Sequence, residues 1–380
     1  MTTGSPASAQ RLSQLCAPHV FSCHEQEPPP FAEAELNRLY GARYACMAHF
    51  RIYGHLARAS TYVARRGGPA GQVAALFLFH RRRRRVAVLN EGIRVGAEQA
   101  SAFAADVFAR YPAADAVAFR FVETDAQPVA FPCQRLACGE DNVMALPATV
   151  AAYLAGLGKS TKATLKHRIN KLKRDFPSFQ LSVYEKEAVP PAYVGEILRL
   201  NRTRMHRKDK VSSIDAREER CVTEFVKACG FVCVATIDGR VCGGAIMYRL
   251  GQNFSARILA HEPAYDTHRL GFVCAYLAIG ACIEAAGAGT FYFGWGQSEY
   301  KYRLGAQARE LSYLVLYRSR LHMLRQAGAA MGWWARSLAF RCVRRVRRGA
   351  RGERTLGAYV AGRVVRAGRW LRAALHPTGC

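Results

Sequence analysis

The sequence lacks the cysteine patterns of metal-binding proteins. It contains 13 cysteines, an odd number, but no Cys-x-x-Cys pair and no Cys/His cluster with the spacing of a zinc site, which excludes the common zinc modules. Several cysteines lie in apolar runs, among them Cys233, Cys242 and Cys274, as buried thiols do in a reducing compartment. The sequence also has no Ser-His-Asp nucleophile motif. We therefore expect no metal site and no serine-hydrolase chemistry.

Segments typical of secretion or membrane insertion are missing as well. The N-terminus has no charged region followed by an apolar one, which a signal peptide would have. The longest apolar run, residues 270–288, contains Glu284 and many small residues, so it predicts a buried helix rather than a membrane span. Together with the cysteine pattern, this predicts a cytoplasmic protein. Peripheral attachment to the inner face of the plasma membrane stays open.

Acidic residues are scarce. The chain has 28 Asp and Glu against 55 Lys and Arg, a net charge of +27. Residues 318–380 alone carry 15 Arg, no Lys and one acid, Glu353, which gives +14, and residues 159–210 carry 14 Lys and Arg against 5 acids, which gives +9. Each stretch can attract phosphate groups, nucleic acid or an anionic membrane. Alternatively, the charges of each stretch lie on a solvent-exposed face and only keep the protein soluble.

Turn signals and hydrophobic periodicity divide the chain into four segments. We expect a loose arm over 1–30, an N-terminal α/β domain over 31–148, a catalytic α/β domain over 149–318 and an Arg-rich amphipathic helical tail over 319–380. The predicted helices are 32–50, 97–111, 160–176, 193–207, 216–229 and 270–286. The predicted strands are 61–65, 72–80, 86–90, 116–122, 179–184, 231–237, 241–250, 254–261, 290–293 and 311–317.

The tail alternates apolar residues with arginine. One predicted helical face carries Leu321, Leu324, Met331 and Leu338, and a second carries Val360, Val364, Leu371 and Leu375, with Trp333, Trp334 and Trp370 between them. Basic amphipathic helices with tryptophan are typical of a membrane surface. Packing of the tail on the catalytic domain is the alternative.

Four segments of the catalytic domain carry a family pattern. The most specific is the glycine-rich block 291–301, with the sequence FYFGWGQSEYK. The others are the basic helix that opens the domain, within residues 153–172, the hairpin 232–245 around Asp238-Gly239, and the segment 263–271. On these segments the domain resembles the acetyltransferases of cellulose and exopolysaccharide loci, a branch of the GNAT superfamily. It is more distantly similar to Fem-type peptidoglycan aminoacyltransferases, which pair two GNAT-like domains.

The resemblance implies an α/β (α+β) fold with a GNAT-like mixed sheet, in two tandem GNAT-like domains followed by the basic tail. It implies an N-acyltransferase that moves an acyl group from acetyl-CoA or another acyl-CoA, without a metal, to an amine of a sugar or of an exopolysaccharide or envelope precursor. One alternative is a Fem-like transferase that uses aminoacyl-tRNA. Another is a non-catalytic protein bound at an anionic membrane surface through its tail.

An amine attacks a thioester only when it is neutral, so the enzyme must remove a proton from it. The nearest candidate bases are Asp266 and Glu299, followed by His261 and Glu262, and the sequence favours none of them. The resemblance implies a tyrosine acid after the strand that follows the long helix, which is the position of Tyr300. The oxyanion would take a backbone N–H as its donor.

The cofactor pyrophosphate is expected at the start of the long apolar helix, where exposed N–H groups and the helix dipole favour anions. Arg269, Leu270 and Gly271 stand there, and Trp295, Gly296 and Lys301 of the glycine-rich block are further cofactor-binding candidates. The chain departs from the family at two positions. Leu270 stands where the family usually has proline, and Tyr292 stands where it usually has an acid.

Overall fold

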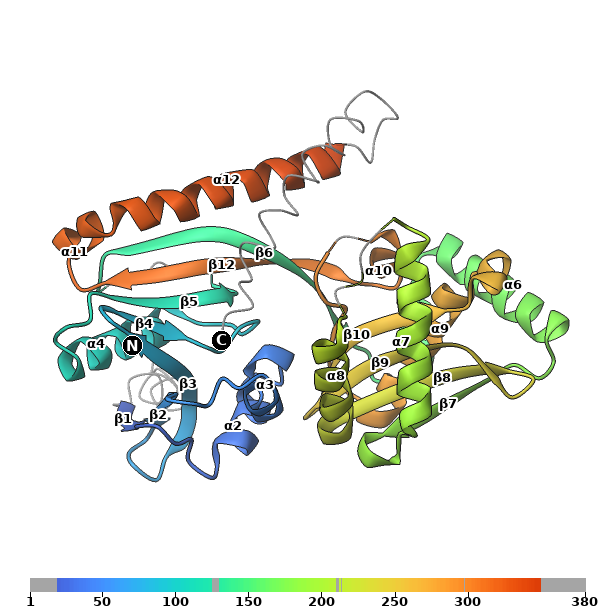
Figure 1. The fold of residues 1–380 in the computed structure, drawn as a ribbon, viewed down its shortest axis with the longest axis horizontal. Coiled ribbons are helices and arrows are strands. Elements are labelled where there is room, and N and C mark those ends of the chain that lie inside the picture. Colours follow the sequence, from blue (N-terminus) through green and yellow to red (C-terminus); the bar gives the residue numbers. More distant parts are fainter. Residues whose placement is uncertain (1–18, 125–129, 210–211, 213, 297, 350–380) are drawn as a thin grey trace, which may run out of the picture. The chain divides into compact units, whose positions relative to one another are not determined.

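The computed structural model describes residues 19–124, 130–209, 212, 214–296 and 298–349 (Figure 1). They belong to two compact units, each assembled from separated stretches of chain. The first unit comprises the described parts of 1–80, 89–93 and 140–309, and the second those of 81–88, 94–139 and 310–380. The predicted boundaries at residues 30, 148 and 318 stay predictions.

The main sheet of the first unit has the strand order β6-β11-β10-β9-β8-β7. Its strands are β6 (Cys133–Leu146, of which 140–146 belong to this unit), β7 (Gln180–Glu185), β8 (Gly230–Ile237), β9 (Arg240–Leu250), β10 (Asn253–His261) and β11 (Gly289–Tyr292). Neighbouring strands are antiparallel except β10 and β11, which run parallel. The meander β8–β10 follows from its turns, because Asp238 and Gly239 both adopt positive φ, as a tight hairpin turn requires.

Helices cover both faces of this sheet. On one face α7 (Pro191–His206) and α8 (Ala216–Cys229) bury residues such as Ile197 and Phe225 against β8, β9 and β10. Gly244 of β9 makes the close approach possible, because a Cβ there would lie 2.6 Å from Cδ1 of Ile197. The other face carries α5 (Val150–Gly156), α6 (Lys159–Asp175) and α9 (Leu270–Ala286).

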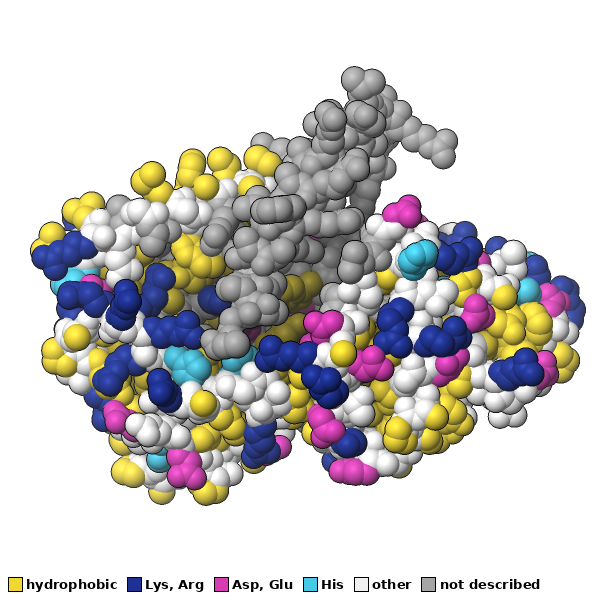
Figure 2. Space-filling view, viewed as in Figure 1, with side chains coloured by type: hydrophobic (Ala, Val, Ile, Leu, Met, Phe, Trp, Pro, Cys, Tyr) yellow, Lys and Arg dark blue, Asp and Glu magenta, His cyan; other side chains and the backbone are white. Residues whose placement is uncertain are grey.

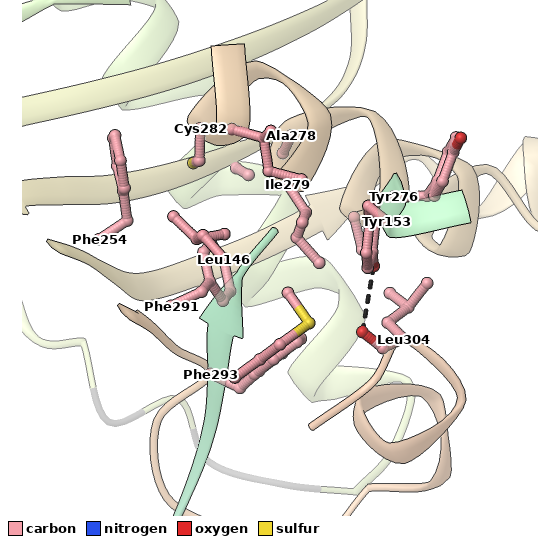
Figure 3. Packing of buried hydrophobic residues seen from close by; sticks show 14 of the residues in the cluster. Leu146, Tyr153, Phe254, Tyr276, Ala278, Ile279, Cys282, Phe291, Phe293 and Leu304 are labelled. Atoms are coloured by element: carbon pink, nitrogen blue, oxygen red, sulfur yellow. Dashed lines mark hydrogen bonds between the residues drawn. The ribbon is translucent and has the colours of Figure 1, made fainter. Parts of the chain in front are cut away.

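A large apolar cluster of this unit lies beneath α9 (Figure 3). Ile279 and Cys282 of α9 point toward Phe291 and Phe293 from the β11 region. The hydroxyl of Tyr153 donates to the backbone oxygen of Leu304 at 3.0 Å. A helix that is apolar on nearly all sides, as α9 is, requires this kind of burial.

The N-terminal part of the first unit is a smaller layer. Strands β1 (His19–His24), β2 (Ser60–Arg66) and β3 (Gln72–Arg82) pair in order. Helices α2 (Ala32–Leu39) and α3 (Met47–Ile52) bury Leu36 and Phe50 against them, and a short 3-10 turn (Arg43–Ala45) separates the two helices. Residues 89–93 also belong to this unit and contribute the buried Asn90.

The second unit contains β4 (Arg85–Val88), β5 (Ala116–Val122), β12 (Gln307–Tyr317, of which 310–317 belong to this unit) and the start of β6, in the order β4-β5-β12-β6. Its helices are α4 (Ala97–Arg110), α11 (Arg320–Arg325) and α12 (Ala327–Gly349). Strand β5 pairs with β4 in parallel and with β12 antiparallel. Within the described residues, no helix of either unit is long and apolar enough to cross a membrane.

The structure differs from the sequence-based expectations at several places. The helix predicted over 32–50 is broken, because the chain turns at Gly41 with φ +47, and a Cβ there would lie 2.3 Å from the Asn253 amide. Strand β6 was not predicted, and residues 19–24, expected in a loose arm, form β1. The remainder of the arm up to residue 18 and the second tail stripe (Val360, Val364, Leu371, Leu375) lie outside the described residues.

Candidate active site

Two parallel strands of the first unit separate just after they begin to pair. Strands β10 and β11 are in register only at Phe254–Phe291 and Ser255–Tyr292. Strand β11 then ends, whereas β10 continues to His261. A bulge between Ala256 and Ile258 also interrupts the pairing of β10 with β9. The rest of β10 therefore has no strand partner on its β11 side within the described part of the chain, so an extended ligand can approach this edge.

A cavity of about 250 Å³ lies where the two strands separate. It is lined by Ala42, Arg43, Tyr44, Gly92, Asp141, Ser255, Ala256, Arg257, Tyr292, Phe293, Gly294 and Trp295. All of these residues belong to the first unit. The polar lining comes from four places in the chain, since β6, β10 and β11 and the turn before α3 each contribute side chains. Its converging polar groups make this cavity a candidate binding site.

Asp141 of β6 is the buried acid of this cavity, with 6% of its surface exposed. Its Oδ1 accepts a hydrogen bond from the backbone N–H of Asn142 at 2.8 Å, and its Oδ2 accepts one from Nη2 of Arg309 at 3.2 Å. Burial raises the pKa of the Asp141 carboxyl, and the Arg309 charge acts in the opposite direction. A carboxylate with a raised pKa, facing a cavity, is suited to accept a proton.

Positive charge exceeds negative charge around the cavity. Glu218 of α8 accepts a hydrogen bond from Arg257 and another from the Tyr53 hydroxyl at 2.9 Å, and it lies 3.8 Å from Arg43. The lining itself holds two guanidinium groups, those of Arg43 and Arg257, and one carboxylate, that of Asp141. This positive charge favours an anionic group or a developing oxyanion in the cavity.

The predicted cofactor residues of the glycine-rich block hold a turn beside the cavity. The Lys301 ammonium is buried and donates to the backbone oxygens of Gly294, Trp295 and Gly296 at 2.7, 3.1 and 3.0 Å. Asn142 donates to two of these oxygens, those of Gly294 and Gly296. Burial lowers the pKa of Lys301 to about 8. These contacts keep Trp295 at the cavity, 5.6 Å from the Tyr44 ring; cofactor binding by Trp295, Gly296 and Lys301 stays a prediction.

Two of the predicted catalytic residues lie together at the far end of β10. Nε2 of His261 is 2.8 Å from Oδ1 of Asp266. The other carboxylate oxygen of Asp266, Oδ2, lies 3.4 Å from Nη1 of Arg207. The His261 ring covers Gly271 so closely that a Cβ on Gly271 would lie 2.5 Å from Nδ1. His261 lies four residue steps along β10 from Arg257 of the cavity, about 13 Å at the rise of a strand. This pair therefore lies beside the start of α9, away from the cavity.

The other predicted residues take different positions. Arg269 adopts a left-handed conformation (φ 51) and caps α9, and Leu270 is fully buried in the core. Tyr300 and Glu299 belong to the short helix α10 (Glu299–Arg303). Tyr300 packs on the core beneath α9, and its burial raises the pKa of the phenol. The catalytic roles of Tyr300, Asp266, Glu299 and His261, and the cofactor roles of Arg269, Leu270 and Gly271, stay predictions.

The basic helix α6 lies against the segment that leads into α9. Arg168 of α6 donates to the backbone oxygen of Thr267 at 2.7 Å, and Asp175 lies 2.9 Å from Nε2 of His268. The side chains of Lys166 and Lys173 are exposed. The basic stretch therefore adds positive charge near the start of α9, and it presents further lysines to solvent.

Sequence reasoning missed Asp141, Arg257 and Glu218. Asp141 stands in a strand that was not predicted, and its ion-pair partner Arg309 is 168 residues away. A usable signal was present, since the polar run from Gly139 to Asn142 lies between apolar residues. Two adjacent acids with apolar flanks favour a buried acidic site in a strand.

Residues 159–302 match the family model described as an acetyltransferase (GNAT) domain. None of the curated proteins matches the chain by sequence. Among solved structures, the crystal structure of FemX superposes with a TM-score of 0.58 at 11% identity, over 77% of this chain and 97% of FemX. The structure of L-PGS from Bacillus licheniformis superposes with a TM-score of 0.46 at 14% identity, over 81% of this chain and 98% of L-PGS. A tandem GNAT protein from the clavulanic acid pathway gives 0.39 at 12%, over 78% and 98%.

The domain match and the FemX superposition establish the class of fold. The chain has a mixed α/β fold, and its residues 159–302 match an acetyltransferase (GNAT) domain, which confirms the expected GNAT-like mixed sheet. At 11% identity the likeness to FemX concerns the fold alone.

Proposed function

We propose that this chain is an acyl-CoA-dependent N-acyltransferase whose acceptor amine is bound in the cavity at the separation of β10 and β11. The observation that carries the proposal is the buried Asp141 carboxylate in that cavity, at the place where the strand edge is open. The family usually has an acid at the position of Tyr292, and Asp141 lines the same cavity from the neighbouring strand β6. We infer that Asp141 takes the place of the missing acid.

The residues at the start of α9 fit the phosphate end of a coenzyme A thioester. The first N–H groups and the dipole of this 17-residue helix favour an anion. Gly271 has no side chain to project at the helix start beside His261, and Arg269 adds a positive charge there. The unpaired edge of β10 joins this helix end to the cavity, so an extended arm can run between them. When bound, the thioester would supply the acyl carbon.

The residues of the cavity would act on the acceptor. Asp141 would accept the proton that the amine loses as its nitrogen attacks, because a carboxylate with a raised pKa holds that proton more readily. A backbone N–H of β10 would donate to the oxyanion. Tyr300 would supply the proton that the departing thiolate takes, and its raised pKa keeps the phenol protonated until then.

We also propose that the acceptor is the amine of a sugar in an envelope or exopolysaccharide precursor. The two guanidinium groups that line the cavity, those of Arg43 and Arg257, support an acceptor that carries a phosphate or another acid. The resemblance to acetyltransferases of exopolysaccharide loci supports a saccharide.

Calorimetric titration of the full chain with acetyl-CoA tests the donor. We expect saturable binding that Arg269→Ala weakens roughly tenfold, the effect of losing one charge-assisted contact. Coenzyme A without an acyl group and a desulfo analogue serve as controls. Transfer to glucosamine or a nucleotide-linked amino sugar is then followed by mass spectrometry, because 13 cysteines would react with thiol reporters. A chain that binds no coenzyme A species is not an acyl-CoA transferase.

The second candidate is an aminoacyl-tRNA-dependent transferase. The exposed lysines of α6 near the start of α9 favour it, and the fold likeness to FemX is compatible with it. Filter binding of tRNA at increasing salt distinguishes the two, because phosphate contacts weaken steeply with ionic strength. Specific, salt-sensitive tRNA binding together with no affinity for acetyl-CoA would favour this candidate.

A further inference from the structure

Exposed apolar side chains gather on the two helices of the tail. Among the described residues, nine large hydrophobic side chains are exposed, and five of them lie between residues 321 and 338. They are Leu321 (56% exposed), Leu324 (70%), Met331 (69%), Trp334 (57%) and Leu338 (46%). The other four, elsewhere in the chain, are all between 37% and 41% exposed. Figure 2 shows hydrophobic side chains projecting along the edge of the second unit where Figure 1 draws α11 and α12.

The exposed side chains of α12 share one face of the helix. Met331, Trp334 and Leu338 are three and four residues apart, which places them on one side at about 100° per residue. The opposite side is attached to the unit. Trp333 stacks on Tyr313 of β12 with ring centroids 4.1 Å apart, and Ser337 is 4% exposed. The helix is thus held by one face, and its apolar stripe points away from the unit's own sheet.

The charged residues of the segment that carries this stripe have one sign. Residues 318–349 contain nine arginines and no lysine, aspartate or glutamate. Arg318 is used within the unit, where it donates to the backbone oxygens of Phe108, Tyr111 and Ala114. By contrast, Arg320, Arg325 and Arg341 are exposed. An apolar stripe flanked by arginine requires a partner with an apolar layer and negative charge.

We propose that the apolar face of α11 and α12 docks flat on a bilayer that contains anionic lipid. Leu321, Leu324, Met331, Trp334 and Leu338 enter the acyl boundary, and the flanking arginines bind lipid phosphates. A second copy of this chain fits poorly, because it would bring arginines against arginines with no acid in the segment. A nucleic acid would use the arginines and leave the leucines and Met331 in water. The inference does not depend on the proposed acyl transfer.

Vesicle co-sedimentation of the full chain tests the docking. We expect binding to vesicles of phosphatidylcholine with about 30% phosphatidylglycerol, little binding to phosphatidylcholine alone, and weaker binding at about 0.5 M NaCl. The double variant Met331→Glu/Leu338→Glu should bind at least about tenfold more weakly to the anionic vesicles. Val183→Glu is the matched control, because Val183 is an exposed hydrophobic residue at 41%, in β7 of the first unit. It should bind like the wild type.

Three further measurements separate membrane docking from unfolding and from dimer formation. The melting temperatures of both variants should equal that of the wild type, since all the substituted side chains are exposed. The triple variant Arg320→Gln/Arg325→Gln/Arg341→Gln should lose the preference for anionic vesicles. Light scattering should give the same mass for the wild type and the double variant. Equal vesicle binding by the double variant and by Val183→Glu would overturn the proposal. A wild-type chain that is a dimer, together with a double variant that is a monomer, would also overturn it.

Discussion

Nη2 of Arg309 lies 3.2 Å from Oδ2 of Asp141, although the two residues are 168 positions apart in the sequence. The same guanidinium lies 5.4 Å from the centre of the Tyr292 ring and donates to the backbone oxygen of Gly92. One arginine therefore contacts both the buried acid and the ring of Tyr292. The protonation state of Asp141 depends on this contact and on burial, which act in opposite directions.

Asp141→Asn should lower kcat/KM for acyl transfer by about 100- to 1,000-fold, the usual contribution of a positioned base. Binding of acetyl-CoA should stay within about twofold of the wild type, because the phosphate end is assigned to the other end of β10. Calorimetry and steady-state kinetics check the two quantities separately. A variant with normal turnover would remove Asp141 from the mechanism.

The acidic limb of the pH–rate profile should report Asp141. The base must be unprotonated to accept a proton, and its pKa is raised. The rate should therefore fall as the pH decreases through a value above the usual carboxyl range of about 4. Arg309→Gln removes the charge that lowers this pKa, so the limb should move to higher pH. If the acidic limb stays at the same pH in Arg309→Gln, the limb reports a group other than Asp141.

Gly271→Ala should weaken acetyl-CoA binding and destabilise the fold by about 1–3 kcal/mol, because the added Cβ would lie 2.5 Å from the His261 ring. Gly280→Ala in the same helix is the control. Its Cβ would meet only Val150 at 3.8 Å, so helix propensity should leave it neutral or stabilise it by up to about 1 kcal/mol. Urea unfolding measures both. Equal effects of the two substitutions would contradict the steric argument.

Lys301→Met should loosen the glycine-rich turn. The substitution removes the Lys301 donor from the backbone oxygen of Trp295 and leaves those of Gly294 and Gly296 with Asn142 as a donor. An unsatisfied buried acceptor costs about 1–3 kcal/mol. Trp295 should then become more accessible to an aqueous quencher, which iodide quenching of tryptophan fluorescence detects when Trp295→Phe serves as the blank. If the activity fell while quenching and the free energy of unfolding stayed unchanged, Lys301 would contact the ligand instead.

The regular elements around the site could be predicted because their signals are local. Helix α9 and helix α8 have the predicted ends, and the Asp238-Gly239 turn fixes the β8–β9 hairpin. The contact between His261 and Asp266 joins residues five apart, so both appear among the candidates. Asp141 was missed because its setting depends on Arg309, which is distant in sequence. The break at Gly41 likewise depends on Asn253, a residue of another strand.

The interleaved division of the chain has a consequence for its synthesis. The first unit needs residues from before position 80 and from as late as 309, and the second unit encloses residues 94–139 together with the chain after 310. Strand β5 pairs Val122 with Ser312, a separation of 190 residues. A ribosome must therefore complete most of the polypeptide before either unit can close. Long sequence separations slow folding and prolong the exposure of unpaired strands, so a nascent chain of this protein is expected to depend on chaperones until its last strand emerges.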